Sequence, residues 1–268
     1  MKIGVFDSGL GGLLVTKSLI NELPKYNYIY LGDTKRLPYG NRSSNTVYEF
    51  LKEALDYLYS KDCALVLVAC NTASAEGIDK IRREYLPKRW PDRKIIGILV
   101  PTVECVLEDS NIKKVGVLAT TGTVSSNSYP KEFKKLNKKI KVFQSAAPLL
   151  VPLIENDGQK WAGPILKEYL KPLLKHKVDV IILGCTHYPI LKKIIKRMID
   201  NKIKIFSQDE LIVKRLERYL SNKKELEIKL KKNRHREFLV TDLTKNFKDR
   251  AKSWFGSKIK LKLVNIQK

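Results

Sequence analysis

The sequence predicts an α/β fold with mainly parallel strands, in two similar halves. Short β-branched runs alternate with helical patterns along the 268 residues, as they do in parallel βα units. The chain also resembles itself, because two segments near its start recur in the same order in its second half. These two observations together favour a duplicated α/β unit.

The predicted strands are short and mostly apolar on both faces, as in a parallel sheet covered by helices on each side. In chain order they are Lys2 to Phe6, Tyr28 to Leu31, Ala64 to Ala69, Lys94 to Leu99, Lys114 to Leu118, Lys141 to Gln144, Val178 to Leu183, Lys204 to Phe206, Glu237 to Val240 and Lys258 to Val264. Helical periodicity fills the intervals between them, for example at Thr46 to Ser60, Ala73 to Tyr85 and Pro189 to Asp200.

The internal repeat pairs two strand ends of the first half with two of the second. The segment Ile3 to Gly9 resembles Val115 to Gly122, and Val66 to Thr72 resembles Ile181 to His187. In each half one strand ends in a polar turn that contains glycine, and a later strand ends in a cysteine. The matching order indicates duplication of one unit.

Composition places the chain among folded globular proteins. A hydrophobic fraction of 43% and a charged fraction of 30% exclude disordered and collagen-like chains. The longest apolar runs reach about six residues, whereas a membrane helix needs roughly 20. The start of the chain is typical of a strand and not of a signal peptide, and the four cysteines form no C-x-x-C motif. We therefore expect reduced thiols, a cytoplasmic location and no membrane partner.

The net charge of +24 arises from 52 Lys and Arg against 28 Asp and Glu. Its lysines are scattered, without an arginine-rich stripe or interleaved aromatic residues that would stack on bases. We interpret most of the excess as solvated surface that could attract a small anionic substrate. Composition alone does not decide between a solvated lysine surface and a nucleic-acid site, so we retain nucleic acid as a secondary partner.

Polar residues gather at the predicted strand ends, where open α/β sheets bind their ligands. They are Asp7, Ser8, Asp33, Cys70, Asn71, Thr72, Thr120, Thr121, Cys185, Thr186 and His187. Helical patterns follow these positions, so helix N-termini would favour anions and lower the pKa of a thiol there.

Cys70 and Cys185 occupy equivalent places in the two halves. Two thiols opposed across one carbon atom can act as paired bases, as a racemase or epimerase requires, because one removes a proton and the other returns it to the opposite face. Asp7 and His187 are placed to set the protonation state of each thiol. Cys63 and Cys105 lack this setting, and we interpret them as packing cysteines.

Three other kinds of site fit less well. A metal site would need a second pair of ligands near Cys185 and His187. The dinucleotide fingerprint fails because Leu14 occupies its third glycine position. A thiol hydrolase built on Cys185 and His187 would leave Cys70 unexplained.

Four segments resemble the signature segments of the bacterial glutamate racemases. They are Asp7-Ser8-Gly9-Leu10-Gly11-Gly12, Leu37-Pro38-Tyr39-Gly40, Ala69-Cys70-Asn71-Thr72-Ala73 and Gly184-Cys185-Thr186-His187-Tyr188-Pro189. Weaker echoes occur at residues 116–124, 148–152 and 240–242. The segments follow the family's order across nearly the whole chain.

The resemblance implies an enzyme, free of cofactor and metal, that interconverts L- and D-glutamate and supplies D-glutamate for peptidoglycan. It also implies two pseudo-symmetric α/β domains, residues 1–96 with 208–268 and residues 97–207, with the active site in the cleft between them. We expect glutamate as the small-molecule partner and a homodimer as the assembly. We retain two alternatives. One is a racemase of another acidic amino acid such as aspartate, and the other is a racemase-fold protein that binds nucleic acid.

By the family's pattern, Cys70 matches the thiol that takes the α-proton from D-glutamate and Cys185 the one that acts on L-glutamate, with Asp7 and His187 as their helpers. The substrate-binding positions match Asp7, Ser8, Pro38, Tyr39, Gly40, Asn71, Thr72, Thr120, Thr123, Thr186 and His187. A carboxylate such as Asp7 or Asp33 would face the substrate ammonium. Ala147 departs from the pattern, since many relatives carry a cysteine there, and leaves both catalytic thiols in place.

Overall fold

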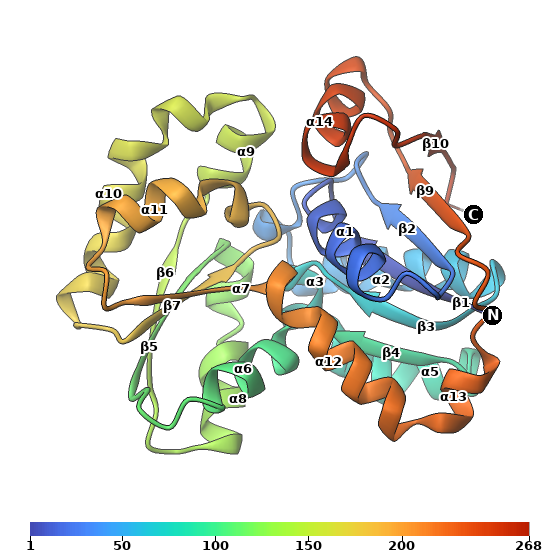
Figure 1. The fold of residues 1–268 in the computed structure, drawn as a ribbon, viewed down its shortest axis with the longest axis horizontal. Coiled ribbons are helices and arrows are strands. Elements are labelled where there is room, and N and C mark those ends of the chain that lie inside the picture. Colours follow the sequence, from blue (N-terminus) through green and yellow to red (C-terminus); the bar gives the residue numbers. More distant parts are fainter. Residues whose placement is uncertain (268) are drawn as a thin grey trace.

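The computed structural model describes residues 1–267 and contains two sheets. The first sheet has the strand order β10-β9-β2-β1-β3-β4, and the second has the order β6-β5-β7-β8. All paired strands of both sheets are parallel. Figure 1 shows the sheets side by side in two lobes. The predicted α/β class is confirmed.

Each predicted strand is present, with its ends shifted by up to three residues. The first sheet contains β1 (Lys2–Asp7), β2 (Tyr28–Gly32), β3 (Cys63–Val68), β4 (Lys94–Gly97), β9 (Arg236–Val240) and β10 (Leu261–Leu263). The second contains β5 (Lys114–Ala119), β6 (Lys141–Ala146), β7 (Val180–Gly184) and β8 (Lys204–Ser207).

Helices connect the strands and cover the faces of both sheets. The α-helices are α1 (Gly12–Glu22), α2 (Ser44–Ser60), α3 (Asn71–Glu76), α4 (Ile78–Lys80), α5 (Leu86–Arg89), α6 (Leu99–Leu107), α7 (Thr121–Ser125), α8 (Ser128–Leu136), α9 (Leu150–Glu155), α10 (Ala162–Lys175), α11 (Lys192–Met198), α12 (Gln208–Asn222), α13 (Lys224–Lys229) and α14 (Lys245–Phe255). Short 3₁₀ or π turns are η1 (Tyr39–Asn41), η2 (Ile81–Tyr85), η3 (Gly158–Trp161) and η4 (Tyr188–Leu191).

Two predicted element limits are wrong for identifiable reasons. The strand predicted at Lys94 to Leu99 ends at Gly97, because the same apolar run continues into the buried start of α6. The helix predicted at Ala73 to Tyr85 is divided at Gly77 into α3, α4 and a π turn. Apolar periodicity marks neither change, since a buried strand and a buried helix turn look alike in sequence.

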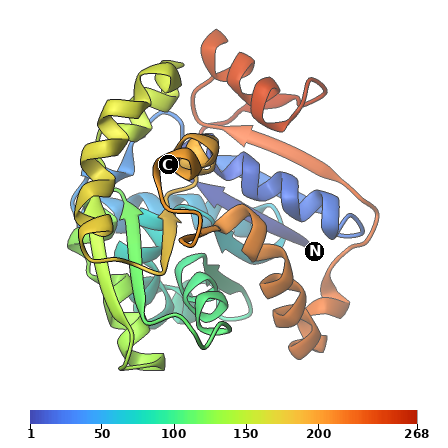
Figure 2. The ribbon, with the colours of Figure 1, turned by 60° about the vertical axis from the view of Figure 1, so that its left-hand side comes forward.

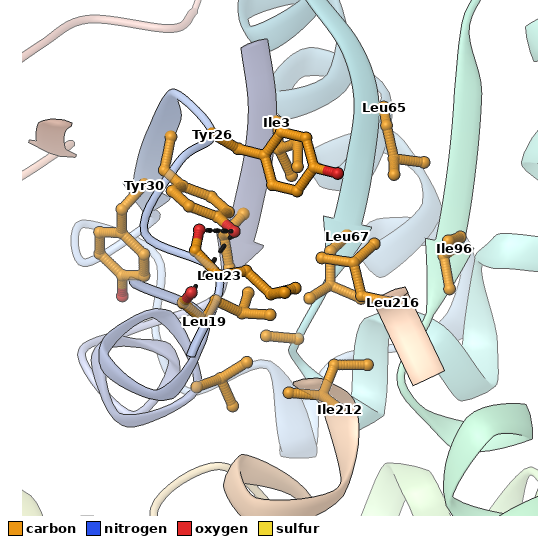
Figure 3. Packing of buried hydrophobic residues seen from close by; sticks show 14 of the residues in the cluster. Ile3, Leu19, Leu23, Tyr26, Tyr30, Leu65, Leu67, Ile96, Ile212 and Leu216 are labelled. Carbon is orange, nitrogen blue, oxygen red and sulfur yellow. Dashed lines mark hydrogen bonds between the residues drawn. The ribbon is translucent and has the colours of Figure 1, made fainter. Parts of the chain in front are cut away.

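The first sheet is buried between helices on its two faces. Ile212 and Leu216 of α12 pack on the side of Leu67 and Ile96, as Figure 3 shows. On the other face, residues of α2 such as Leu51 join the cluster that contains Val66 and Val68. The nearly continuous apolar strands are thus covered on both sides, as predicted.

The chain passes from the first sheet to the second between β4 and α6, and it returns between β8 and α12. α6 packs in the cluster of the second sheet through Val103 and Val106, whereas α12 packs on the first. The order β2-β1-β3-β4 corresponds strand by strand to β6-β5-β7-β8. The repeated segments therefore occupy equivalent central strands in the two lobes.

α14 and α9 lie at the same end of the molecule, on either side of the line between the lobes, in both views (Figures 1 and 2). α14 also packs on α1. No helix within the described residues is long and apolar enough to cross a membrane.

Candidate active site

The carboxyl ends of the central strands meet at a small pocket between the lobes. Cys70 follows β3 and Cys185 follows β7, so each lobe contributes one thiol. The pocket encloses about 20 Å³ of water-accessible space. Its walls are Ser8, Leu37, Pro38, Tyr39, Gly40, Cys70, Asn71, Thr72, Thr120, Val151, Cys185, Thr186 and His187.

Helix capping fixes two of these side chains. The Cys70 Sγ accepts a hydrogen bond from the backbone N–H of Ala73 (3.4 Å) at the start of α3. In the second lobe, the Thr120 Oγ1 accepts one from the N–H of Thr123 (3.4 Å) at the start of α7. A side chain that caps a helix cannot turn freely, so both groups are held at the pocket wall.

Cys70 is only 5% exposed, and its thiol donates a hydrogen bond to the Ser8 Oγ at 3.3 Å. Burial, reinforced by the nearby charge of Asp7, raises the pKa of Cys70 to about 12. The expected lowering of a thiol pKa by the helix N-terminus is therefore wrong for Cys70. Loss of hydration disfavours the thiolate more than the helix end favours it.

Cys185 has a different environment. Its Sγ lies 3.8 Å from the His187 Nδ1, and the His187 Nε2 lies 2.5 Å from the Glu155 Oε1. Burial alone would lower the pKa of His187, but the contacts with Cys185 and Glu155 raise it well above the ordinary value. A protonated imidazole next to the sulfur stabilises a thiolate.

Glu155 and Arg250 complete this arrangement, and the sequence did not indicate either one. The Arg250 Nη1 lies 3.3 Å from the Glu155 Oε2. Burial alone would raise the pKa of Glu155, but His187 and Arg250 together lower it. Glu155 follows the pocket residue Val151 by one helical turn of α9, which is the one sequence signal that could have indicated it.

Asp7 lies behind the pocket wall and is fully buried. Its Oδ1 accepts a hydrogen bond from the Thr186 hydroxyl (3.1 Å), and its Oδ2 accepts one from the N–H of Gly9 (3.1 Å). Burial raises its pKa. Asp7 thus contacts a wall residue of the second lobe, Thr186, from the end of β1.

Asp33 also lies outside the pocket wall. Its carboxylate accepts hydrogen bonds from Arg36 (2.6 Å), Tyr39 (2.5 Å) and Thr241 (2.8 Å). These contacts hold the Tyr39 ring in the wall, and they occupy the carboxylate that we considered for a substrate ammonium.

Two of the predicted binding residues have side chains engaged behind the wall. The Asn71 amide pairs with that of Gln208 (2.5 and 2.6 Å) and accepts a hydrogen bond from Tyr129 (2.9 Å). Thr123 accepts a hydrogen bond from Thr120 (3.0 Å) and does not belong to the wall. The hydroxyl of Thr120 also contacts that of Thr72 (2.9 Å) across the two lobes.

Cys63 and Cys105 lie away from the pocket. Cys63 is fully buried at the amino end of β3, as predicted for a packing cysteine. Cys105 is partly buried in α6 and accepts a hydrogen bond from the Arg215 Nε (3.1 Å).

Residues 3–214 match the family of Asp/Glu/hydantoin racemases. The chain belongs to this racemase family. The predicted resemblance and the predicted enzyme class, an amino-acid racemase, are thereby confirmed.

Similarity to individual racemases extends over the whole chain. The chain is 37% identical to the glutamate racemase of Sulfurihydrogenibium sp. (strain YO3AOP1) over 269 residues, which cover 99% of this chain and 98% of that one. A glutamate racemase structure from Bacillus anthracis superposes with a TM-score of 0.90 at 33% identity, covering 98% of this chain and 97% of that one. The glutamate racemase of Francisella tularensis subsp. tularensis SCHU S4, solved in complex with D-glutamate, gives a TM-score of 0.88 at 32% identity, with coverages of 99% and 97%.

Proposed function

We propose that this racemase interconverts L- and D-glutamate with two cysteines as its acid and base, and without a cofactor. The observation that carries the proposal is that Cys70 and Cys185 line one small pocket from opposite lobes. The full-length similarity to glutamate racemases supports glutamate as the substrate.

In the proposed reaction, the Cys185 thiolate removes the α-proton of L-glutamate, so that the C–H bond breaks and an S–H bond forms. The Cys70 thiol then donates its proton to the opposite face of the α-carbon, and D-glutamate is formed with Cys70 as thiolate. The reverse reaction exchanges the two roles. His187 assists Cys185 through its 3.8 Å contact, and Asp7 assists Cys70 through its charge.

Hydroxyl and amide donors around the pocket suit the two carboxylates of glutamate. We propose that the substrate is held by Asp7, Ser8, Pro38, Tyr39, Gly40, Asn71, Thr72, Thr120, Thr123, Thr186 and His187, of which Asp7 and Thr123 act from behind the wall. α3 begins at the wall residue Asn71 and α7 begins next to the wall residue Thr120, so the first turns of both helices lie beside the pocket. Fixed donors in a dry pocket stabilise the carbanionic transition state more than water does.

Circular dichroism of L-glutamate solutions tests this function. We expect wild type to racemise L-glutamate and to leave L-aspartate unchanged, while Cys70→Ser and Cys185→Ser each abolish the activity. Cys105→Ser is the matched control and retains activity, because Cys105 lies outside the pocket. Racemisation of aspartate instead would establish the alternative substrate, and inactivity of folded wild type on both would contradict the proposal.

We further propose that the enzyme works in the cytoplasm as a homodimer and supplies D-glutamate for peptidoglycan. All four cysteines are free thiols, which suits a reducing compartment. Light scattering on the purified chain tests the dimer.

The net charge of +24 keeps nucleic acid as a secondary candidate partner. Binding to a duplex that persists at about 150 mM salt would support it, because nonspecific lysine–phosphate contacts weaken steeply with salt.

A further inference from the structure

Arg250 is a buried charge that reaches from α14, next to the first sheet, to α9 of the second lobe. Its side chain is 3% exposed, and the carboxylate of Glu155 that it contacts is 7% exposed. A second ion pair, with Asp157 (3.3 Å), ends at a carboxylate that is 69% exposed. The Arg250 Nε has no hydrogen-bond partner among the described residues. Burial of a guanidinium costs free energy unless an anion pairs with it, and the carboxylate of Glu155 is that anion.

The contacts of Arg250 continue to a reacting atom. Arg250 holds the Glu155 Oε2, the Glu155 Oε1 holds the His187 Nε2, and the His187 Nδ1 faces the Cys185 sulfur. One turn further along α14, the edge of Trp254 meets the His187 ring, with centroids 5.8 Å apart and an interplanar angle of 89°. One face of α14 therefore fixes both Glu155 and the imidazole from the opposite lobe.

We propose that Arg250 is a positioning residue for the half-reaction of Cys185, an inference that rests on the proposed function. Arg250 keeps Glu155 ionised and oriented, so that Glu155 holds His187 as the protonated neighbour of the thiolate. Without the guanidinium, the proton on His187 passes to the buried Glu155 carboxylate. The neutral imidazole then no longer stabilises the Cys185 thiolate.

The effect is confined to one of the two thiols. Cys70 makes its hydrogen bonds with Ser8 and the N–H of Ala73, and among the described residues none of its hydrogen bonds involves α14. Loss of Arg250 therefore slows proton transfer at Cys185 and leaves proton transfer at Cys70 unchanged. A general loss of structure would slow both.

Kinetic isotope effects separate these cases, whereas rates alone cannot. Because the equilibrium constant between enantiomers is one, kcat/KM changes equally in the two directions. In Arg250→Met we expect kcat/KM to fall by about tenfold, part of what a positioned proton-transfer group contributes. The isotope effect measured with 2-deuterated L-glutamate rises, because transfer to Cys185 becomes more rate-limiting. The isotope effect with 2-deuterated D-glutamate falls towards one.

Two further variants keep the test decisive. Arg250→Lys retains a charge but loses the planar fork, so we expect smaller shifts in the same directions, and this variant replaces Arg250→Met should that chain not fold. Arg93→Met is the control, because Arg93 pairs with Asp62 near the amino end of β3, away from the pocket. Isotope effects that stay as in wild type, or that change equally for both enantiomers, overturn the inference. Absence of racemisation by wild type would instead contradict the proposed function.

Discussion

At the scale of single residues, the two cysteines that we propose as acid and base are alike in sequence and unlike in environment. Each follows a central strand, but only Cys185 faces a cationic partner, His187. Cys70 lies near the carboxylate of Asp7 and has its pKa raised to about 12, mainly by burial. The sequence predicts the positions of both thiols, because apolar runs indicate where the strands end. It does not predict the different charges around the two thiols.

The sequence does not indicate Arg250, and it indicates Glu155 only through the one-turn spacing from Val151, and the reason is physical. Both lie on helices, where a charged side chain is ordinarily solvated. Only the fold brings them together as a buried ion pair, which joins segments remote in sequence.

The protonation of His187 makes the stability of the fold depend on pH. Because its native pKa lies well above 6.5, the native state holds the proton more tightly than the unfolded chain. The stability due to this proton is complete below pH 6.5 and is lost as pH rises through the native pKa. The advantage of wild type over His187→Gln should therefore shrink above pH 6.5 by up to about 1.4 kcal/mol per pH unit. Urea unfolding of both proteins at pH 6, 7 and 8 measures this difference in unfolding free energy. A difference that stays constant or grows with pH would contradict the raised pKa of His187.

At the scale of elements, the strands were predicted well and the helix limits less well. Val- and Ile-rich runs specify a buried strand directly. The break at Gly77 and the short turn before α11 depend on the packing of neighbouring helices, which one sequence does not display.

The start of α1 lies tightly against the β7 loop of the other lobe. A Cβ at Gly11 would lie 2.5 Å from the Thr186 Oγ1 and 2.7 Å from the His187 Nδ1. Gly11→Ala must therefore displace the wall of the pocket. We expect a loss of about 1–3 kcal/mol in unfolding free energy and a loss of activity approaching 100-fold.

Gly163→Ala is the matched control for that substitution, because a Cβ at this position in α10 would meet no other described segment within 4 Å. Pro164 follows this position and disfavours a helical residue with a Cβ before it, which offsets the helix propensity of alanine, so we expect the unfolding free energy to change by no more than about 1 kcal/mol. Thermal unfolding and the circular dichroism assay compare the two variants, and equal behaviour of both would contradict the tight contact at Gly11.

At the scale of the whole molecule, the two lobes enclose a pocket of about 20 Å³ between the carboxyl ends of their central strands. The repeat predicts two similar lobes from sequence. The return of the C-terminal tail to the first sheet followed only from the family resemblance, since no local pattern indicates which sheet β9 joins. The limits 1–96 with 208–268 and 97–207 stay a prediction for the domains.

A buried polar cluster joins the lobes at the two crossings. Gln208 at the start of α12 contacts Asn71 of α3, Tyr129 of α8 and Thr102 of α6 (3.4 Å). Gln208→Leu leaves the Asn71 Nδ2 without its acceptor and removes one of the two hydrogen bonds of the Tyr129 hydroxyl, and we expect a loss of about 1–3 kcal/mol in unfolding free energy.

Urea unfolding measures that loss against Gln144→Leu. Within the described part of the chain the Gln144 Oε1 has no hydrogen-bond partner, so replacing Gln144 costs less. If Gln208→Leu lowers the unfolding free energy no more than Gln144→Leu does, the buried polar cluster does not stabilise the junction between the lobes.

The location of deuterium in an early reaction mixture tests the central claim, two opposed thiols, most directly. Wild type is given ordinary L-glutamate in D₂O, and the reaction is stopped at low conversion before the enantiomers are separated and weighed by mass spectrometry. With two bases, the D-glutamate carries one deuterium, because Cys70 delivers a solvent-derived proton, while the remaining L-glutamate keeps its original hydrogen. Deuterium appearing in the remaining L-glutamate as fast as D-glutamate forms would show that one base serves both faces, and it would contradict the two-thiol mechanism.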